Sequence, residues 1–492
     1  MAGWCSRVVG SVVCLMLSSQ PLFAQEGPYT DHSDPLSTQV TFDDPLLNRR
    51  GSWGQAYADQ WGLFEINGFR PRRASEMAAP VYQPADLKPV VVALVDTGID
   101  YRHPELPRDR LWVNPLERSD GLDNDGNGRV DDLIGWDFIS NSNQPWDDHG
   151  HGTHIAGIIA AKANNGRGIS GVASNARLMV LKALNSAGYG RGSDIAEAIH
   201  YAVDQGAELI HLSLGGKPPG PLERRAIAYA QAAGRLVVVA AGNRSELIAE
   251  QGFESIPEVL VVGAVAPGRQ RARFSDWGTR LDLVAPGVDV LSLRAWGSDF
   301  LLRDGEQGYQ PGDAIVSREY YRASGNSFAA PFVTAAAAVL LGQNPQLSPS
   351  ELKRVLRQSA QPLGPEGHDQ LHGAGLVDVA AALEQVPAHF LVAQFNYAEW
   401  QPEQGLLLYG RADADQFISA RLEYGIGLKP SYWQMLDTPV IRQPRNGPLA
   451  VIQPDQLPAE EWVTLRLVVE HADGSFGRSQ LQLQRLQSGE RE

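Results

Sequence analysis

A serine at the start of a long apolar stretch is the strongest candidate nucleophile in this sequence. Ser327 follows Gly325 and Asn326 and precedes a nearly charge-free run of helix-forming residues, 328–341. Such a run predicts a buried helix, and the N-terminus of a helix favours developing negative charge. A small hydroxyl there, beside a glycine that lets another chain approach, suits a nucleophile. Taken alone, the pattern also fits a serine that caps a core helix.

Three closely spaced histidines, His149, His151 and His154, form the second candidate motif. The small residues that follow from Ala156 predict a tightly packed helix with His151 at its start. His151 and His154 are one helical turn apart and could bind a metal, but the carboxylate spacing of helical metal proteases is missing. On its own, this motif fits a metal site and a general base equally well.

An aspartate at the end of an apolar segment is the third candidate. Asp96 follows the run 90–95 and precedes Thr97 and Gly98. A continuous apolar run bounded by glycine is typical of a central parallel strand. A carboxylate at its C-terminal end lies at the edge where α/β sheets place their sites, although aspartate there can also merely cap a turn.

Alternating strands and helices must position these three motifs. Strands are expected at 178–181, 209–214, 236–241 and 259–265, and helical spacing of apolar residues appears within 195–203 and 226–233. This alternation predicts an α/β fold, a parallel sheet with helices on both faces. Beyond residue 387 the sequence pattern changes to short candidate strands separated by Gly and Pro. This pattern predicts a C-terminal all-β sandwich over 390–490.

The three motifs occur in the order Asp96, His151, Ser327. With its flanking residues, this order resembles that of the subtilisin-like serine proteases, the subtilases or peptidase S8 family, over roughly 44–386. The resemblance implies a subtilisin-like fold and hydrolysis of peptide bonds. It also implies the roles: Ser327 attacks, His151 takes its proton, and Asp96 orients the imidazole.

The same resemblance implies further site residues. Asn243, which follows the expected strand 236–241 and Gly242, matches the asparagine that stabilises the oxyanion in this family. A second segment resembles the strand that pairs with an extended substrate, and it consists of Ser213, Leu214, Gly215 and Gly216. His211 stands where relatives commonly have asparagine.

Two departures from the family pattern bear on substrate access. Arg244 occupies a pocket-rim position that is often acidic in relatives, so we expect poor acceptance of Lys or Arg before the cleaved bond and an apolar or acidic preference. The connection 292–323 is longer than usual and carries five aromatic residues. Because loops this long are often functional, it is expected to form a flap near the cleft; its aromatic residues are Trp296, Phe300, Tyr309, Tyr320 and Tyr321.

An acidic, glycine-rich segment over 120–132 predicts a calcium loop. Oxygen-bearing side chains alternate with other residues, and glycine stands at the sharp turn, as in the first half of an EF-hand loop. Ile134 replaces the usual final glutamate, and an acidic solvated turn is the alternative interpretation. The expected ligands of a structural Ca²⁺ are Asp123, Asp125, Asn127, the Arg129 carbonyl, and Asp131 or Asp132.

The chain's ends and overall charge suggest its environment. Residues 1–24 are expected to be a signal peptide and 25–43 a loose leader, shorter than the pro-domain usual in subtilases, before a catalytic domain over 44–387. Both cysteines, Cys5 and Cys14, lie in the signal segment, so the exported protein would have no disulfide. The net charge of −15 without a basic block argues against nucleic acids and anionic membranes as partners.

The sequence therefore favours a secreted or periplasmic, calcium-stabilised serine endopeptidase acting on proteins or peptides. We expect a monomer without a membrane span once the signal peptide is removed. The C-terminal domain resembles the immunoglobulin- or fibronectin-like domains appended to some exported subtilases. Two alternatives are a catalytically silent binding protein on the same scaffold, and a metallohydrolase built on the three histidines, which would leave Ser327 and Asp96 unexplained.

Overall fold

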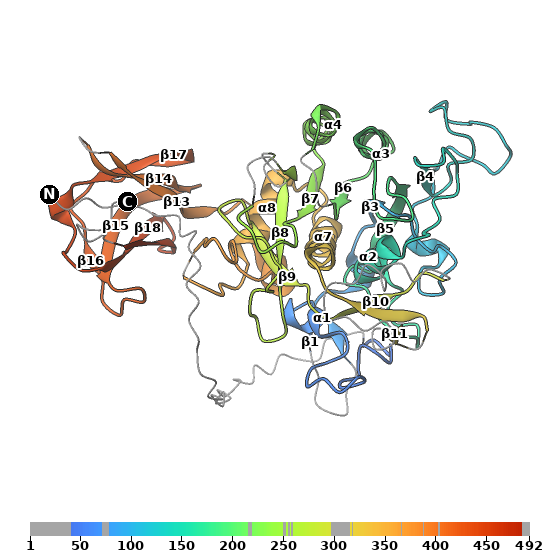
Figure 1. Cartoon of the computed structure of the whole chain (residues 1–492), viewed down its shortest axis with the longest axis horizontal. Coiled ribbons are helices and arrows are strands. Elements are labelled where there is room, and N and C mark those ends of the chain that lie inside the picture. Colours follow the sequence, from blue (N-terminus) through green and yellow to red (C-terminus); the bar gives the residue numbers. More distant parts are fainter. Residues whose placement is uncertain are drawn as a thin grey trace. The chain divides into compact units, whose positions relative to one another are not determined.

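The computed structural model describes residues 41–70, 78–214, 219–248, 252–253, 256, 259–296, 315–316, 318–365, 367–386, 388–401 and 404–484. The expected signal peptide and most of the expected leader lie outside these residues, as do Gly215, Gly216, Phe300 and Tyr309. The chain divides into two compact units at Leu391 and Val392 (Figure 1).

The larger unit contains the parallel sheet that the sequence predicts. Its seven strands lie in the order β4-β5-β3-β6-β7-β8-β9, and neighbours run parallel. They are β3 (Val90–Asp96), β4 (Gly135–Asp137), β5 (Ala176–Lys182), β6 (Leu209–Leu212), β7 (Leu236–Ala240), β8 (Leu260–Val265) and β9 (Leu283–Pro286). The sheet grows from β3 first toward β4 and then, in the other direction, toward β9. The carboxyl end of β3 is therefore a topological switch point, and Asp96 lies there.

Helices cover both faces of this sheet. One core contains residues of α2 (His151–Ala160), α7 (Asn326–Gln343), α8 (Pro349–Gln358) and α9 (Val379–Glu384). The other contains residues of α3 (Gly192–Asp204) and α4 (Pro221–Ala232), which lie across the sheet from α2 and α7 (Figure 1). Because successive side chains of a strand point to opposite faces, Val92 and Leu94 of β3 join the first core, while Ala93 and Val95 join the second.

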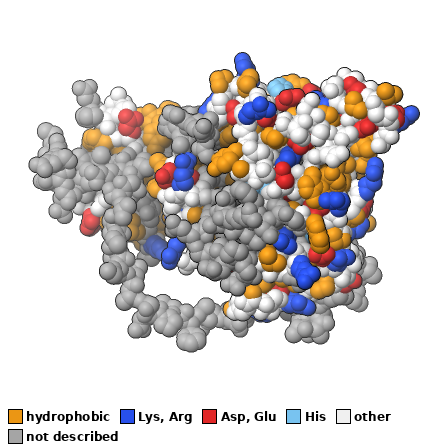
Figure 2. All heavy atoms as spheres, turned by 45° about the vertical axis from the view of Figure 1, so that its right-hand side comes forward, with side chains coloured by type: hydrophobic (Ala, Val, Ile, Leu, Met, Phe, Trp, Pro, Cys, Tyr) orange, Lys and Arg blue, Asp and Glu red, His pale blue; other side chains and the backbone are white. Residues whose placement is uncertain are grey.

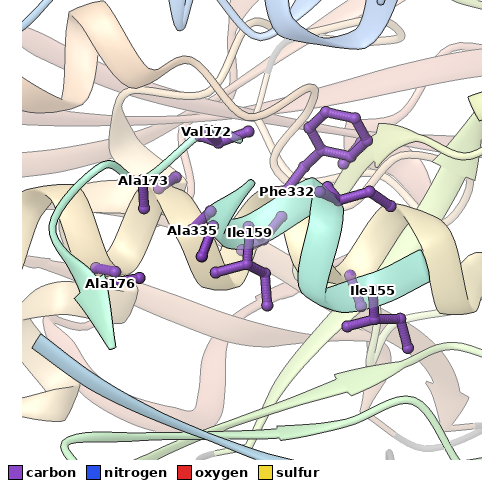
Figure 3. Packing of buried hydrophobic residues seen from close by; sticks show 14 of the residues in the cluster. Ile155, Ile159, Val172, Ala173, Ala176, Phe332 and Ala335 are labelled. Carbon is purple, nitrogen blue, oxygen red and sulfur yellow. The ribbon is translucent and has the colours of Figure 1, made fainter. Parts of the chain in front are cut away.

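The helix that carries Ser327 runs through the first core. Figure 3 shows Ile155 and Ile159 of α2 close to Phe332 and Ala335 of α7. Among the described helices, α7 is the one that is long and apolar enough to cross a membrane, but 89% of its apolar window is buried inside the unit. The expected buried helix is confirmed, with helical bounds that begin one residue before Ser327.

The expected flap is only partly described, and its two ends belong to the core. β10 (Val290–Leu293), β11 (Ile315–Val316) and β12 (Tyr320–Ala323) form an antiparallel sheet in the order β10-β12-β11. Tyr320 and Tyr321 are buried within it, whereas Trp296 is 76% exposed. The two tyrosines therefore pack in the interior and do not face the cleft as a flap would require.

The end of the expected leader is also packed. Phe42 is 2% exposed and meets Phe69 edge-to-face, with 5.5 Å between ring centroids. The compact unit therefore includes residues 41–43 rather than starting at Asp44. Its remaining short elements are α1 (Trp61–Glu65), β1 (Phe69–Arg70), β2 (Ala79–Pro80) and the 3₁₀ turns η1 (Pro84–Asp86) and η2 (Arg108–Arg110).

The smaller unit is all β, as the sequence predicts. One sheet has the order β13-β14-β17 and the other β16-β15-β18-β19. The strands are β13 (Leu391–Gln401), β14 (Gly405–Ala414), β15 (Phe417–Ile426), β16 (Gln434–Met435), β17 (Gln443–Ile452), β18 (Trp462–His471) and β19 (Phe476–Gln484), with a 3₁₀ turn η4 (Pro454–Gln456). The alternating residues Val463, Leu465, Leu467 and Val469 of β18 are fully buried, as expected. Thr464 and Val468, on the opposite face, are also buried, so most of this strand is covered on both faces.

Figure 2 shows how charged side chains are distributed on one face of the molecule. On the described part of the face in Figure 2, Lys and Arg side chains lie among Asp and Glu side chains, without a large block of one sign.

Candidate active site

Asp96 and His151 meet at the switch point of the sheet. Nδ1 of His151 lies 2.7 Å from Oδ1 of Asp96, and both side chains are buried. Burial alone would raise the pKa of Asp96 and lower that of His151, but their mutual attraction outweighs it. The pKa of Asp96 is therefore lowered and that of His151 raised, as expected for a carboxylate that stabilises an imidazolium.

Two glycines allow β3 and α2 to approach this closely. A Cβ atom on Gly152 would lie 2.1 Å from the carbonyl oxygen of Gly98 and 3.2 Å from Oδ1 of Asp96. Gly98 has φ +95°, and a Cβ there would lie 2.5 Å from the carbonyl oxygen of Pro145. The glycines that flank the two motifs thus have a steric reason for their positions.

A buried aspartate that sequence reasoning missed holds the start of α2. Asp147 is fully buried and accepts hydrogen bonds from three backbone N–H groups and two hydroxyls. The donors are the N–H groups of His149 (3.0 Å), Gly150 (2.7 Å) and Thr153 (2.9 Å), and the hydroxyls of Thr153 (2.6 Å) and Thr97 (2.8 Å). Asp147 accepts from backbone N–H groups two and three residues further on, as in an Asx turn, and an aspartate shortly before a helical motif is the turn signal that could have identified it.

Ser327 lies in the first turn of α7, directly before a residue that packs against His151. The ring of the next residue, Phe328, is 5.4 Å from the His151 ring, and Ser327 itself is partly exposed. Ser327 and His151 both lie in the described part of the chain, and Ser327 Oγ forms no hydrogen bond with the imidazole of His151. Catalytic hydrogen bonds of this kind are often long until substrate binds. The start of α7, which carries the Ser327 hydroxyl, therefore lies near the Asp96–His151 pair.

Asn243 is oriented by the helix that carries Ser327. Its Oδ1 accepts a hydrogen bond from the backbone N–H of Asn326 at 2.8 Å, which leaves the Nδ2 donors directed elsewhere. Asn243 is exposed, and a Cβ on Gly325 would lie 3.5 Å from Nδ2. An amide held in this way can offer its N–H groups to a developing oxyanion.

Asn326 ties the end of β7 to the start of α7. Its Oδ1 accepts from the hydroxyl of Ser275 at 3.0 Å, and its Nδ2 donates to the carbonyl of Gly242. The carbonyl of Gly242 and the side chain of Asn243 therefore both contact one residue of α7. These two hydrogen bonds to Asn326 set the separation between Asn243 and Ser327.

The described part of the expected substrate strand contacts the nucleophile segment. Ser213 follows β6 directly and donates its hydroxyl to the carbonyl oxygen of Ser327 at 3.0 Å. Leu214 is 7% exposed. Nε2 of His211 lies 2.7 Å from the Ser213 hydroxyl.

The histidines are not arranged as metal ligands. Nε2 of His154 faces the carbonyl oxygens of Val290 (3.2 Å) and Tyr321 (3.3 Å), and its ring lies between the rings of Tyr321 and Phe328. Burial lowers the pKa of His154 to about 3, so this side chain is neutral. Among the described residues, His149, His151 and His154 form no cluster of potential ligand atoms. The metallohydrolase alternative therefore has no geometric support.

Three carboxylates gather in the expected calcium loop. Ligand oxygens of Glu117, Asp125 and Asp132 lie within 4.8 Å of one another. Nδ2 of Asn114 donates to Asp125 at 2.9 Å and to Asp132 at 3.0 Å. Burial, together with the charge of Asp125, raises the pKa of Asp132. Glu117 was not among the expected ligands, because it precedes the loop motif in the sequence.

The other expected ligands shape the loop. Asp123 accepts from the N–H groups of Gly126, Asn127 and Gly128, and Asp131 accepts from those of Asp120 and Gly121. Nδ2 of Asn127 donates to Asp125 at 2.9 Å and to Asp132 at 2.8 Å. The guanidinium of Arg129 lies over aromatic rings of the body of the unit, those of Trp136, Phe138 and Tyr201.

The chain is similar to one known protein family and to several known proteins. The subtilase family model matches residues 88–375. A thermophilic serine proteinase of Bacillus sp. (strain AK1) is 37% identical over 278 residues, 56% of this chain and 57% of that protein. Subtilisin-like protease 1 of Plasmodium berghei is 29% identical over 60% of this chain and 49% of that protein. The chain thus spans about half the length of these two relatives. Subtilisin DY of Bacillus licheniformis is 32% identical over 63% of this chain and 96% of that protein.

Proposed function

Because this chain belongs to the subtilase family of serine peptidases, we propose that it is an exported endopeptidase that cleaves proteins or peptides through Asp96, His151, Ser327 and Asn243. The observation that carries the proposal is the 2.7 Å contact between Asp96 and His151, formed beside the helix start that bears Ser327. Export is supported by the signal-like segment 1–24 and by the confinement of both cysteines to it.

The proposed reaction uses the four side chains in sequence. Ser327 Oγ attacks the peptide carbonyl carbon while Nε2 of His151 takes the hydroxyl proton. Asp96 holds Nδ1–H and stabilises the imidazolium, and Asn243 Nδ2 donates to the oxyanion. The imidazolium then gives its proton to the leaving amine, which releases the first product and leaves an ester on Ser327. Water, deprotonated by His151, hydrolyses that ester and restores the serine.

A structural calcium ion is a second part of the proposal. Glu117, Asp125 and Asp132 fit Ca²⁺, because they are hard oxygen donors placed close enough to repel one another without a cation. A bound Ca²⁺ would neutralise these charges and stabilise the loop. Asn127, Asp123, Asp131 and the carbonyl of Arg129 remain candidates for direct or water-mediated contacts.

The test is cleavage of a protein substrate by purified wild-type chain and by Ser327→Ala, with fragments identified by mass spectrometry. We expect internal cleavages by the wild type and none above background by the variant. Equal cleavage by both would point to a contaminant or to another nucleophile. A folded, calcium-loaded wild type that binds peptides but never cleaves them would favour the silent binding protein.

A further inference from the structure

The carbonyl of Ser327 lacks its usual helical partner. In an α-helix, the carbonyl of residue i accepts from the N–H of residue i+4. For Ser327 that residue is Pro331, which lies inside α7 and has no N–H. The hydroxyl of Ser213 donates to this carbonyl at 3.0 Å, from the end of β6. A side chain of the sheet thus replaces the missing hydrogen bond in the turn that carries the nucleophile.

This replacement fixes the direction of the next hydrogen bond. A serine hydroxyl has a single proton to donate. If that proton goes to the Ser327 carbonyl, the contact of 2.7 Å between Ser213 Oγ and His211 Nε2 requires Nε2 to be the donor. Nε2 of His211 must therefore be protonated.

Thr334 holds the other nitrogen of the same ring. Nδ1 of His211 lies 2.8 Å from Thr334 Oγ1. His211 is fully buried, and this burial lowers its pKa to about 3, so the neutral ring has one proton only. With Nε2 protonated, Nδ1 must accept from the Thr334 hydroxyl. The other acceptor near that hydroxyl is the Ala330 carbonyl at 3.2 Å, which has Thr334's own N–H as its helical partner.

The opposite tautomer would be costly at the site. With the proton on Nδ1, Nε2 would draw the Ser213 proton to itself, and the Ser327 carbonyl would lose its side-chain donor. A partly buried acceptor that loses its donor is destabilising, and here the loss would fall on the first turn of α7.

We propose that His211 is a positioning residue of this peptidase: its Nε2–H, held by Thr334, directs the Ser213 hydroxyl onto the Ser327 carbonyl and so fixes the nucleophile's helical turn. The proposal rests on the proposed function for the role of Ser327, but the tautomer of His211 does not depend on that role.

Nitrogen NMR of ¹⁵N-histidine-labelled protein tests the tautomer directly. Ser327→Ala is the sample of choice, because it keeps the backbone carbonyl and prevents self-cleavage. We expect the histidine signals that vanish in His211→Gln to come from a ring with protonated Nε2 and unprotonated Nδ1 that stays neutral down to about pH 5. A proton on Nδ1, or a charged ring at neutral pH, would overturn the proposal.

Kinetics of paired variants test the positioning role. His211→Gln places an amide nitrogen near the position of Nε2, whereas His211→Leu removes the donor. Loss of one such hydrogen bond predicts a fall of about tenfold or more in kcat for the Leu variant, with KM nearly unchanged. The Gln variant should recover most of kcat. Equal losses in both variants, each accompanied by the same drop in Tm, would reduce His211 to a packing residue.

A double variant completes the test. Ser213→Ala should lower kcat as His211→Leu does, and combining the two should add little, because they interrupt one chain of hydrogen bonds. Additive losses would contradict a shared pathway. If the wild type itself were inactive, the proposed function would fail, while the NMR result would still decide the tautomer.

Discussion

Nδ1 of His151 and Oδ1 of Asp96 lie 2.7 Å apart at the carboxyl end of the central strand. The two residues are separated by 55 positions in the chain, and glycines at 98 and 152 permit their contact. Since the contact determines both the tautomer and the basicity of His151, the predicted activity should depend on it more than on any other buried pair.

Asp96→Asn should change the pH dependence as well as the rate. Catalysis needs neutral His151, whose pKa is raised above its ordinary value despite burial because Asp96 attracts the protonated form. Activity should therefore be lost as pH falls through that raised pKa. Without the carboxylate, burial dominates, and the acid limb should move to lower pH while kcat falls by about 10⁴-fold.

The measurement is kcat/KM from pH 5 to 9, with Asp148→Asn as the matched control. Asp148 pairs with Lys182 at 2.7 Å and loses the same charge without contacting the imidazole. The control should keep the wild-type acid limb. An unchanged acid limb in Asp96→Asn would show that the contact between Asp96 and His151 does not set the pKa of His151.

Asn243 should act through its donors rather than its acceptor. Asn243→Asp keeps an oxygen for the Asn326 N–H but removes both amide donors. Asn243→Ala removes both the acceptor oxygen and the donors. Each should lower kcat by about 10²- to 10³-fold with little change in KM. Steady-state kinetics on a peptide ester and a peptide amide measure this effect; a loss confined to KM would place Asn243 in substrate binding instead.

Calcium should stabilise the larger unit through the three clustered carboxylates. At Ca²⁺ about 100-fold above its Kd, binding adds about 2.7 kcal/mol, enough to raise Tm by about 5 °C. The double variant Glu117→Gln/Asp132→Asn should lose most of this calcium-dependent shift. Asp109→Asn is the control, because Asp109 pairs with Lys162 outside the loop. A full shift in the double variant, measured by calorimetry with and without EDTA, would exclude this site.

Arg244 should disfavour basic side chains before the cleaved bond. Its side chain is 63% exposed and lies 3.7 Å from that of Glu246, a pair too exposed to cancel its charge firmly. In a peptide library we expect few cleavages after Lys or Arg, and Arg244→Glu should raise them on the order of tenfold. A wild-type profile dominated by Lys or Arg would refute this expectation.

Local patterns were enough to predict the sheet and to select the candidate catalytic motifs. The apolar runs that became β3, β5, β6, β7 and β8 are continuous and bounded by glycine or polar residues, so their buried state follows from hydrophobicity alone. Asp96, His151, Ser327 and Asn243 stand beside such runs in short, specific motifs. Because each motif is local, the sequence could identify it without knowledge of the fold.

Contacts between distant segments could not be predicted in the same way. Glu117 joins Asp125 and Asp132 because the loop folds back, and the donation of Ser213 to Ser327 crosses 114 positions. Tyr320 and Tyr321 read as parts of an exposed insertion, yet pairing of β12 with β10 buries them. In each case the partner is set by tertiary packing, which leaves no periodic signal in the chain.

Covalent labelling of Ser327 tests the central claim most directly. A fluorophosphonate reacts only with a serine whose hydroxyl is activated by a base, and tandem mass spectrometry identifies the modified residue. We predict labelling at Ser327 in the folded, calcium-loaded wild type, its loss in His151→Ala, and no label in Ser327→Ala. Labelling at another residue, or none in protein shown to be folded, would contradict the assignment of this chain as a serine endopeptidase.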